Sequence, residues 1–119
     1  MALKRKNVYL VPINSVYGNE VYFPYAAGVL AAYALEDETV RENYIFNKIV
    51  YVREEAEAAV ENMEEPFLVG FSTYIWNFEY SKFIACELKN RFPECLIVFG
   101  GHQVPEGVQL LEDYPYIDI

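Results

Sequence analysis

The sequence contains few of the residues that build metal centres and redox sites. In 119 residues it has 2 cysteines and 1 histidine. Cys86 and Cys95 lack the C-x-x-C spacing of zinc and thiol-redox motifs, and no histidine adjoins either of them. We therefore predict no metal site, and we interpret both cysteines as buried free thiols of a protein in the reducing cytoplasm.

Basic residues and long apolar runs are also scarce. Lysine and arginine total 9 against 18 aspartate and glutamate residues, which gives a formal charge of -9. A field of this sign repels a phosphate backbone, so we expect no nucleic-acid partner. No apolar run reaches the length of a membrane span, and no charged-then-apolar signal segment opens the chain. We therefore expect a cytoplasmic protein with no membrane partner.

What the sequence does contain is enough apolar material for a core. Hydrophobic residues make up 54% of the chain and aromatic residues 17%, which excludes a disordered or low-complexity segment. A chain of this length can bury a core without disulfides or metals. No internal repeat or linker divides it, so we predict a single domain over residues 1–119.

Short apolar segments alternate with helical patterns along the chain. This alternation predicts a three-layer α/β fold with a mostly parallel sheet and right-handed crossovers. The predicted strands are 8–13, 44–51, 67–73, 96–99 and 116–119, and the predicted helices are 24–37, 54–63, 77–92, where Asn77 is the candidate N-cap, and a short one near Pro105. The last strand stops without the helix that should follow it.

The predicted strand order is 2-1-3-4-5, as in flavodoxin-like folds, and it places the candidate site. In this order the switch point lies between the first and third strands, where ligands bind beyond the carboxyl ends. The third strand ends at Ser72 and Thr73, and the fourth ends at Gly100 and Gly101. Together with the long loop 14–23, these small residues predict a binding edge that a bulky ligand can approach closely.

The first predicted helix has almost no polar face. It runs from Pro24 through AAGVLAAYALED, with small side chains at most positions. Either it packs tightly between the sheet and the loops, or its outer face docks on another surface. The sequence leaves both alternatives open.

Several kinds of nucleotide and catalytic site are excluded by their missing motifs. The chain has neither G-x-G-x-x-G nor the P-loop pattern, and the acidic residues that a phosphoreceiver needs after its first and third strands are absent. Ser72 has no neighbouring histidine in sequence to activate it as a nucleophile. We predict no catalytic residue.

Two stretches carry a resemblance to a known family. These are VGFSTYIWN, residues 69–77, and FGGHQVPEG, residues 99–107; the helix PYAAGVLAAYAL and the final YIDI support them. Together they resemble the cobalamin-binding domain at the N-terminus of radical S-adenosylmethionine (radical SAM) enzymes, over essentially the whole chain. The resemblance implies a Rossmann-like domain whose cleft holds the nucleotide tail of cobalamin between the third and fourth strands.

The resemblance also implies roles for individual residues. Ser72 and Thr73 would form hydrogen bonds with the tail, and Gly100 and Gly101 would leave room for it. The corrin side of the site, or the seam to the next domain, would be lined by Tyr74, Trp76 and Asn77. His102 would be a rim residue in contact with a corrin amide or phosphate, or else an incidental loop histidine; the tyrosines and Trp76 are alternatively core residues.

Two departures from familiar motifs limit what this chain does alone. The D-x-H-x-x-G motif, whose histidine ligates cobalt in better-known cobalamin modules, is absent between Asn14 and Gly28. The C-x-x-x-C-x-x-C loop of radical enzymes is absent as well. The resemblance therefore implies a detached module that binds cobalamin without that histidine and presents it to the radical SAM domain of the same parent chain.

In that parent, S-adenosylmethionine and the iron–sulfur cluster would belong to the downstream domain, and the reaction would be a methyl transfer or another cobalamin-dependent radical reaction. Two alternatives stay open: a docking module of such an enzyme that has lost cobalamin, and an unrelated flavodoxin-like domain that binds a flavin or nucleotide at the same edge.

Overall fold

A computed structural model describes residues 4–14 and 24–119 of the chain. The described residues form a four-stranded sheet in the order β2-β1-β3-β4, and each pair of neighbouring strands is parallel. The strands are β1 (Lys6–Val11), β2 (Tyr44–Phe46), β3 (Pro66–Thr73) and β4 (Leu96–Gly101). The α/β class, the parallel sheet and the first four positions of the predicted strand order are confirmed.

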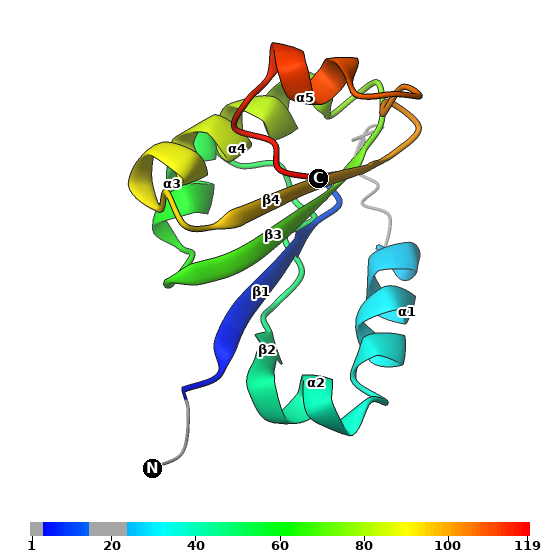
Figure 1. Cartoon of the computed structure of the whole chain (residues 1–119), viewed down its shortest axis with the longest axis vertical. Coiled ribbons are helices and arrows are strands. Elements are labelled where there is room, and N and C mark those ends of the chain that lie inside the picture. The colour runs from blue at the N-terminus through cyan, green and yellow to red at the C-terminus, as the bar shows by residue number, and fades with distance from the viewer. Residues whose placement is uncertain (1–3, 15–23) are drawn as a thin grey trace.

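The helices lie on both faces of the sheet (Figure 1). They are α1 (Tyr25–Ala34), α2 (Glu38–Asn43), α3 (Ala56–Glu61), α4 (Phe78–Arg91) and α5 (Gln109–Asp113). One face carries α3, α4 and α5, and the other carries α1. This is the layered arrangement that alternating strands and helices predict.

The core lies between the sheet and α3 with α4. Successive side chains of a strand point to opposite faces, and in β3 the alternate residues Val69, Phe71 and Thr73 are buried while their neighbours are half-buried. Ile84 and Leu88 of α4 complete the core from the helix side. Among the residues that the structure describes, the other face of the sheet, toward α1, is therefore the less covered one.

The predicted fifth strand is not present. Residues 116–119 form no strand, although backbone hydrogen bonds join Asp118 and Ile119 to Ile97 and Phe99 of β4. The Asp118 side chain takes part as well, because its carboxylate accepts from the Ile97 N–H at 2.8 Å and from Lys89 at 2.6 Å. A carboxylate in this position occupies the Ile97 donor that a strand backbone would otherwise use.

The second predicted strand is much shorter than expected, and a helix precedes it. Strand β2 ends at Phe46, after which the chain follows β1 only through isolated bonds such as Val50 N–H to Leu10 O. Before it, the chain turns and forms α2, whose N-cap Asp37 accepts a hydrogen bond from Val40 N–H. The single long helix predicted over residues 24–37 is thus α1 followed by a turn.

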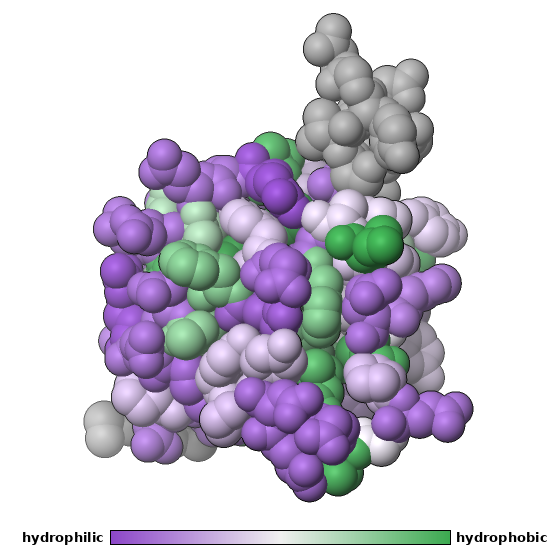
Figure 2. All heavy atoms as spheres, turned by 90° about the horizontal axis from the view of Figure 1, so that it is seen from above, coloured by the Kyte–Doolittle hydropathy of each residue, from purple (hydrophilic) through white to green (hydrophobic). Residues whose placement is uncertain are grey.

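The view from above shows a mainly hydrophilic surface. Hydrophobic side chains appear on this face as separate small groups among hydrophilic ones (Figure 2). This mixture agrees with the excess of acidic residues in the sequence. Across residues 4–14 and 24–119, no helix is long and apolar enough to cross a membrane.

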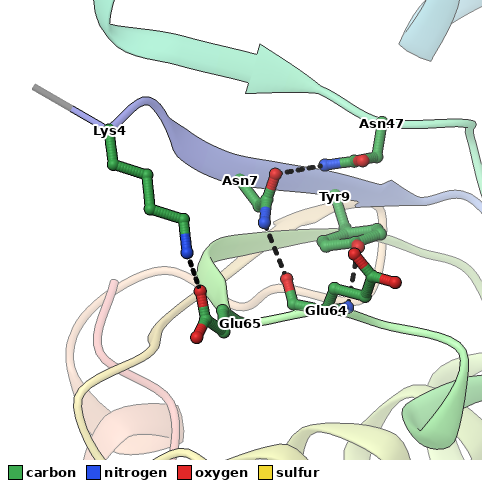
Figure 3. Close-up of polar contacts among 6 residues, drawn as sticks. All are labelled: Lys4, Asn7, Tyr9, Asn47, Glu64 and Glu65. Carbon is green, nitrogen blue, oxygen red and sulfur yellow. Dashed lines mark hydrogen bonds and ion pairs between the residues drawn. The ribbon is translucent and has the colours of Figure 1, made fainter. Parts of the chain in front are cut away.

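A polar cluster ties β1 to its neighbours at the amino-terminal end of the sheet (Figure 3). The amide of Asn7 donates to Glu64 O at 2.8 Å and accepts from Asn47. The Tyr9 hydroxyl accepts a bond from Glu64 N–H, and Lys4 pairs with Glu65. These contacts lie where the register between β1 and β3 shifts, at Asn7 and Val8, at the end of the sheet opposite the predicted site.

Candidate functional site

The two strand ends singled out by the sequence lie side by side. In the parallel ladder of β3 and β4, Ser72 is the partner of Gly100 and Thr73 is the partner of Gly101. The hydroxyl-bearing end and the bare end therefore share one rim, at the carboxyl edge of the sheet. Of the third predicted part of this rim, the loop 14–23, only Asn14 lies within the described residues.

Gly101 is required by its surroundings rather than by a ligand. Its φ is +100°, and a Cβ at this position would lie 2.6 Å from the backbone oxygen of Thr73. No side chain fits there without moving the β3 backbone. Gly100 differs, because a Cβ built on it meets nothing within 4 Å. Space is thus open beside Gly100 and closed beside Gly101.

That open space belongs to a pocket between the sheet and α1. Its volume is about 380 Å³, within the range of roughly 300–1,000 Å³ that is usual for small-molecule sites. Its walls are mostly apolar, and they include Ser72, Gly100 and Gly101 from the predicted site together with Leu10, Pro12, Ala26, Ala27, Leu30, Leu68, Gly70 and Val98. Among residues 4–14 and 24–119, no bulky side chain closes the space beside Gly100.

Three other predicted site residues form an aromatic cluster after β3 and β4. The rings of Tyr74 and Trp76 are stacked, with centroids 4.6 Å apart and planes 6° apart. The His102 ring packs against the Tyr74 ring, with the two centroids 5.2 Å apart. Trp76 is 46% exposed, so part of this flat surface faces solvent. The structure therefore brings Tyr74, Trp76 and His102 together, and His102 is not isolated in its loop.

The last two predicted residues, Thr73 and Asn77, are fully buried. The Thr73 hydroxyl donates to the Gly100 carbonyl oxygen at 2.8 Å. Asn77 occupies the N-cap position of α4, but its side chain makes no capping bond. Its amide instead donates to Ile13 O and Ser72 O. The predicted side-chain cap is wrong, because the Asn77 Oδ1, which would accept the capping bond, accepts from the Tyr74 N–H instead.

Arg53 lies next to this site, but it was not predicted as a site residue from the sequence. Its guanidinium donates to the Trp76 carbonyl at 2.6 Å and lies over the ring of Tyr80 at 4.7 Å. Burial raises the pKa of Tyr80, and the phenol donates to Glu54 O. Arg53 thereby fixes the backbone of the aromatic cluster from outside the sheet and places a positive charge near it.

The apolar residues that line the pocket were not predicted from the sequence. Leu10, Leu68 and Val98 occupy the strand positions that alternate with the core residues, so a period of two was the available signal. That signal is weak in parallel strands, which read as continuous apolar runs. Within the part of the chain that the structure describes, no group of three or more histidine, cysteine, aspartate or glutamate residues could hold a metal ion.

Known proteins resemble this chain along its whole length. It is 31% identical over 120 residues to the cobalamin-dependent radical SAM methyltransferase TokK of Streptomyces tokunonensis, covering 100% of this chain and 17% of that protein. The chain is homologous to part of a cobalamin-dependent radical SAM methyltransferase. The family resemblance identified in the sequence is therefore confirmed, although no family model matches the chain.

A second methyltransferase gives the same result. The chain is 30% identical over 115 residues to the 2-(S-pantetheinyl)-carbapenam-3-carboxylate methyltransferase of Streptantibioticus cattleyicolor, covering 96% of this chain and 16% of that protein. The chain thus spans about one sixth of the length of these methyltransferase relatives. Because the match to TokK covers 100% of this chain, it includes the whole pocket and the aromatic cluster.

Proposed function

We propose that this chain is a cobalamin-binding module of a radical SAM enzyme and that the pocket beside Gly100 receives the nucleotide tail. The relationship to a cobalamin-dependent methyltransferase over the full chain is the observation that carries the proposal. The pocket supports it, since a flat benzimidazole ring is an apolar ligand that suits apolar walls. Cobalamin, when bound, supplies a cobalt-centred carrier for a methyl group.

Each of the predicted site residues has a place in this proposal. Ser72, Gly100 and Gly101 line the space for the tail. Thr73 holds the carbonyl of Gly100 and so fixes the pocket wall from behind. The exposed aromatic cluster of Tyr74, Trp76 and His102 provides a flat surface for the corrin at the mouth, and Asn77 supports that surface from the core.

No histidine of this chain is proposed as a cobalt ligand. His102 packs on Tyr74 in the described structure, and the segment from Asn14 to Gly28 contains no histidine. The proposal therefore assigns no cobalt ligand to this chain, and Tyr74, Trp76 and His102 would offer an aromatic surface to the corrin. The S-adenosylmethionine, the iron–sulfur cluster and the methyl transfer itself belong to a radical SAM domain outside these 119 residues.

A titration tests this function. Hydroxocobalamin is added to the 119-residue chain, and two signals are recorded: the visible spectrum of the cofactor and the fluorescence of Trp76, the single tryptophan of the sequence. Saturable changes in both signals support the proposal. Absence of cobalamin binding together with saturable binding of flavin mononucleotide would contradict it, and would favour a flavodoxin-like site.

A second candidate function is a docking module, and α1 is the observation that favours it. Tyr25 and Tyr33 are 77% and 75% exposed, and Val29 and Leu30 of the same helix are exposed as well. No charged residue lies between Tyr25 and Ala34. An uncharged helix with exposed large side chains is typical of an interaction surface. The partner in this reading is the remainder of a longer enzyme chain, and titration with hydroxocobalamin would then give no binding.

A further inference from the structure

The side chain of Asn77 joins the ends of two strands inside the protein. Its Nδ2 donates to the carbonyl oxygen of Ile13 at 3.0 Å and to that of Ser72 at 2.9 Å. Its Oδ1 accepts from the N–H of Tyr74 at 2.9 Å. The residue is 0% exposed, so water cannot replace these bonds if they are lost.

Trp76 converges on the same carbonyl. Its indole Nε1–H donates to Ile13 O at 3.0 Å, beside the bond from Asn77. Two donors on one carbonyl use both of its lone pairs. The end of β1 thus receives the amide of Asn77 and the indole of Trp76 together, and the position of one donor constrains the position of the other.

The same side chain also fixes the second ring of the stack. The N–H of Tyr74 is bonded to the Asn77 side chain, and the N–H of Asn77 returns a bond to Tyr74 O at 3.1 Å. This closed loop sets the backbone from which the Tyr74 ring projects. The stacked pair, with planes only 6° apart, is therefore held at Tyr74 directly by Asn77 and at Trp76 through their shared acceptor.

We infer that Asn77 is a positioning residue that orients the Tyr74–Trp76 aromatic pair at the carboxyl edge of the sheet. The consequence for cofactor binding rests on the proposed function. In that function, Asn77 sets the aromatic surface that the corrin meets, without itself touching the corrin. Only a side chain with two donors and one acceptor of this size makes all three bonds. An isosteric aspartate keeps the acceptor and loses both donors.

The variants for the test are Asn77→Asp, Asn77→Ser and the control Asn62→Asp. Asn77→Asp removes both donors at constant size. Asn77→Ser removes the bridge between the two carbonyls without burying a charge, and so covers the case in which the aspartate variant fails to fold. Asn62 is exposed at the end of α3, and Asn62→Asp makes the same change of charge away from the aromatic pair.

The first readout needs no cofactor. Near-ultraviolet circular dichroism and acrylamide quenching of Trp76 report the packing of the stack, and far-ultraviolet circular dichroism selects variants that remain folded. We expect the aromatic bands of folded Asn77 variants to fall and quenching of Trp76 to rise about twofold, because the Ile13 carbonyl that accepts from the half-exposed indole is no longer held by Asn77. Aromatic bands equal to those of the unchanged chain and of Asn62→Asp would overturn the inference.

The second readout is the dissociation constant for hydroxocobalamin. We expect it to rise about tenfold in the folded Asn77 variants and to stay unchanged in Asn62→Asp. A disturbed stack with an unchanged dissociation constant would overturn the proposed consequence for cofactor binding. If the unchanged chain binds no hydroxocobalamin, the proposed function fails, and the spectra of the cofactor-free variants still decide whether Asn77 orients the pair.

Discussion

The hydroxyl of Thr73 donates a hydrogen bond to the carbonyl oxygen of Gly100 across the β3–β4 pair, at 2.8 Å. Thr73 is completely buried, whereas Gly100 lines the pocket. A side chain on the core face of one strand thus holds the pocket wall on the next strand. The pocket depends on the core behind it as much as on the residues that line it.

Replacing Thr73 separates this bond from the packing around it. Thr73→Val keeps the shape and leaves the Gly100 carbonyl without its side-chain donor, which we expect to lower the free energy of unfolding by about 1–2 kcal/mol. Thr73→Ser keeps the hydroxyl and loses one methyl group, at a cost of about 0.8 kcal/mol. Urea denaturation of both variants measures the difference, and equal stability of Thr73→Val and the unchanged chain would show that the bond contributes nothing.

A comparison of Gly101 with Gly107 measures how much stability is lost when a side chain meets the Thr73 backbone. Both have positive φ, +100° and +86°, but only at Gly101 would a Cβ collide with the Thr73 backbone. We expect Gly101→Ala to destabilise the chain by about 3 kcal/mol and Gly107→Ala by about 1 kcal/mol from strain alone. Thermal melting compares them, and a smaller effect at Gly101 would mean that β3 moves to accept the methyl group.

The ion pair of Lys89 with Asp118 makes stability depend on pH in the acid range. Burial raises the pKa of Asp118, but the hydrogen bonds from Lys89 and from Ile97 N–H outweigh it, so the folded pKa lies below the ordinary value of 3.8. A carboxyl group with a lowered pKa stabilises the fold above its unfolded pKa, and this contribution is lost as pH falls through the folded value.

We therefore expect the unchanged chain to lose about 1 kcal/mol more stability than Asp118→Asn between about pH 5 and about pH 2. Urea denaturation of both proteins across this range measures the difference. Parallel stability curves for the two proteins would show that the pair makes no pH-dependent contribution.

The outward face of α1 is predicted to be dispensable for folding. Tyr25 and Tyr33 are largely exposed, and substitutions at exposed positions change stability by roughly 0.5 kcal/mol or less. We expect the double variant Tyr25→Lys, Tyr33→Lys to melt within about 3 °C of the unchanged chain and to bind less of the apolar dye anilinonaphthalene sulfonate. A large loss of stability would instead show that these side chains pack within the chain.

Buried thiol chemistry gives a further check on the core. Burial raises the pKa of Cys95 to about 11, and the residue is 1% exposed, whereas Cys86 is half-buried on α4. A thiol with a raised pKa is a poor nucleophile near neutral pH. We expect iodoacetamide at pH 8 to alkylate Cys95 only after denaturation. Alkylation of Cys95 in the native chain, read by mass spectrometry, would contradict the packing around β4.

The sequence predicted the order of the four strands and the shared rim of two strand ends, because both depend on local signals. Apolar runs that end in Ser72 and Gly100 mark strand ends, and parallel topology brings such ends to one edge. Register then follows from the buried face of each strand. The pairing of Ser72 with Gly100 is the consequence.

The directions of side chains could not be predicted in the same way. Thr73 and Asn77 were expected to face a ligand, but a shift of one residue along a strand moves a side chain to the opposite face, and Thr73 points into the core. Asn77 lies at a helix start and would cap it in isolation. Its Oδ1 instead accepts from the Tyr74 N–H. Its amide donates to the carbonyl of Ser72, which is close in sequence, and to that of Ile13, which comes from a distant part of the chain.

Local patterns also misjudged the two edges of the sheet. Residues 44–51 have the apolar content of a strand, but the chain leaves the regular ladder after Phe46. Helix α2 carried a readable signal in its cap Asp37, followed by Glu38 in the first turn and Arg41 in the last. Residues 116–119 lie beside β4, where the Asp118 carboxylate takes the place of a backbone acceptor.

The most direct test of the account compares two leucine substitutions of glycine. Gly100→Leu fills the pocket, whereas Gly28→Leu adds the same side chain in α1, where a Cβ also meets nothing within 4 Å and where the residue does not line the pocket. Both variants are titrated with hydroxocobalamin after circular dichroism has shown that they are folded. We expect Gly100→Leu to weaken binding at least about 100-fold and Gly28→Leu to bind like the unchanged chain; equal affinities in all three proteins would contradict binding of the cofactor in this pocket.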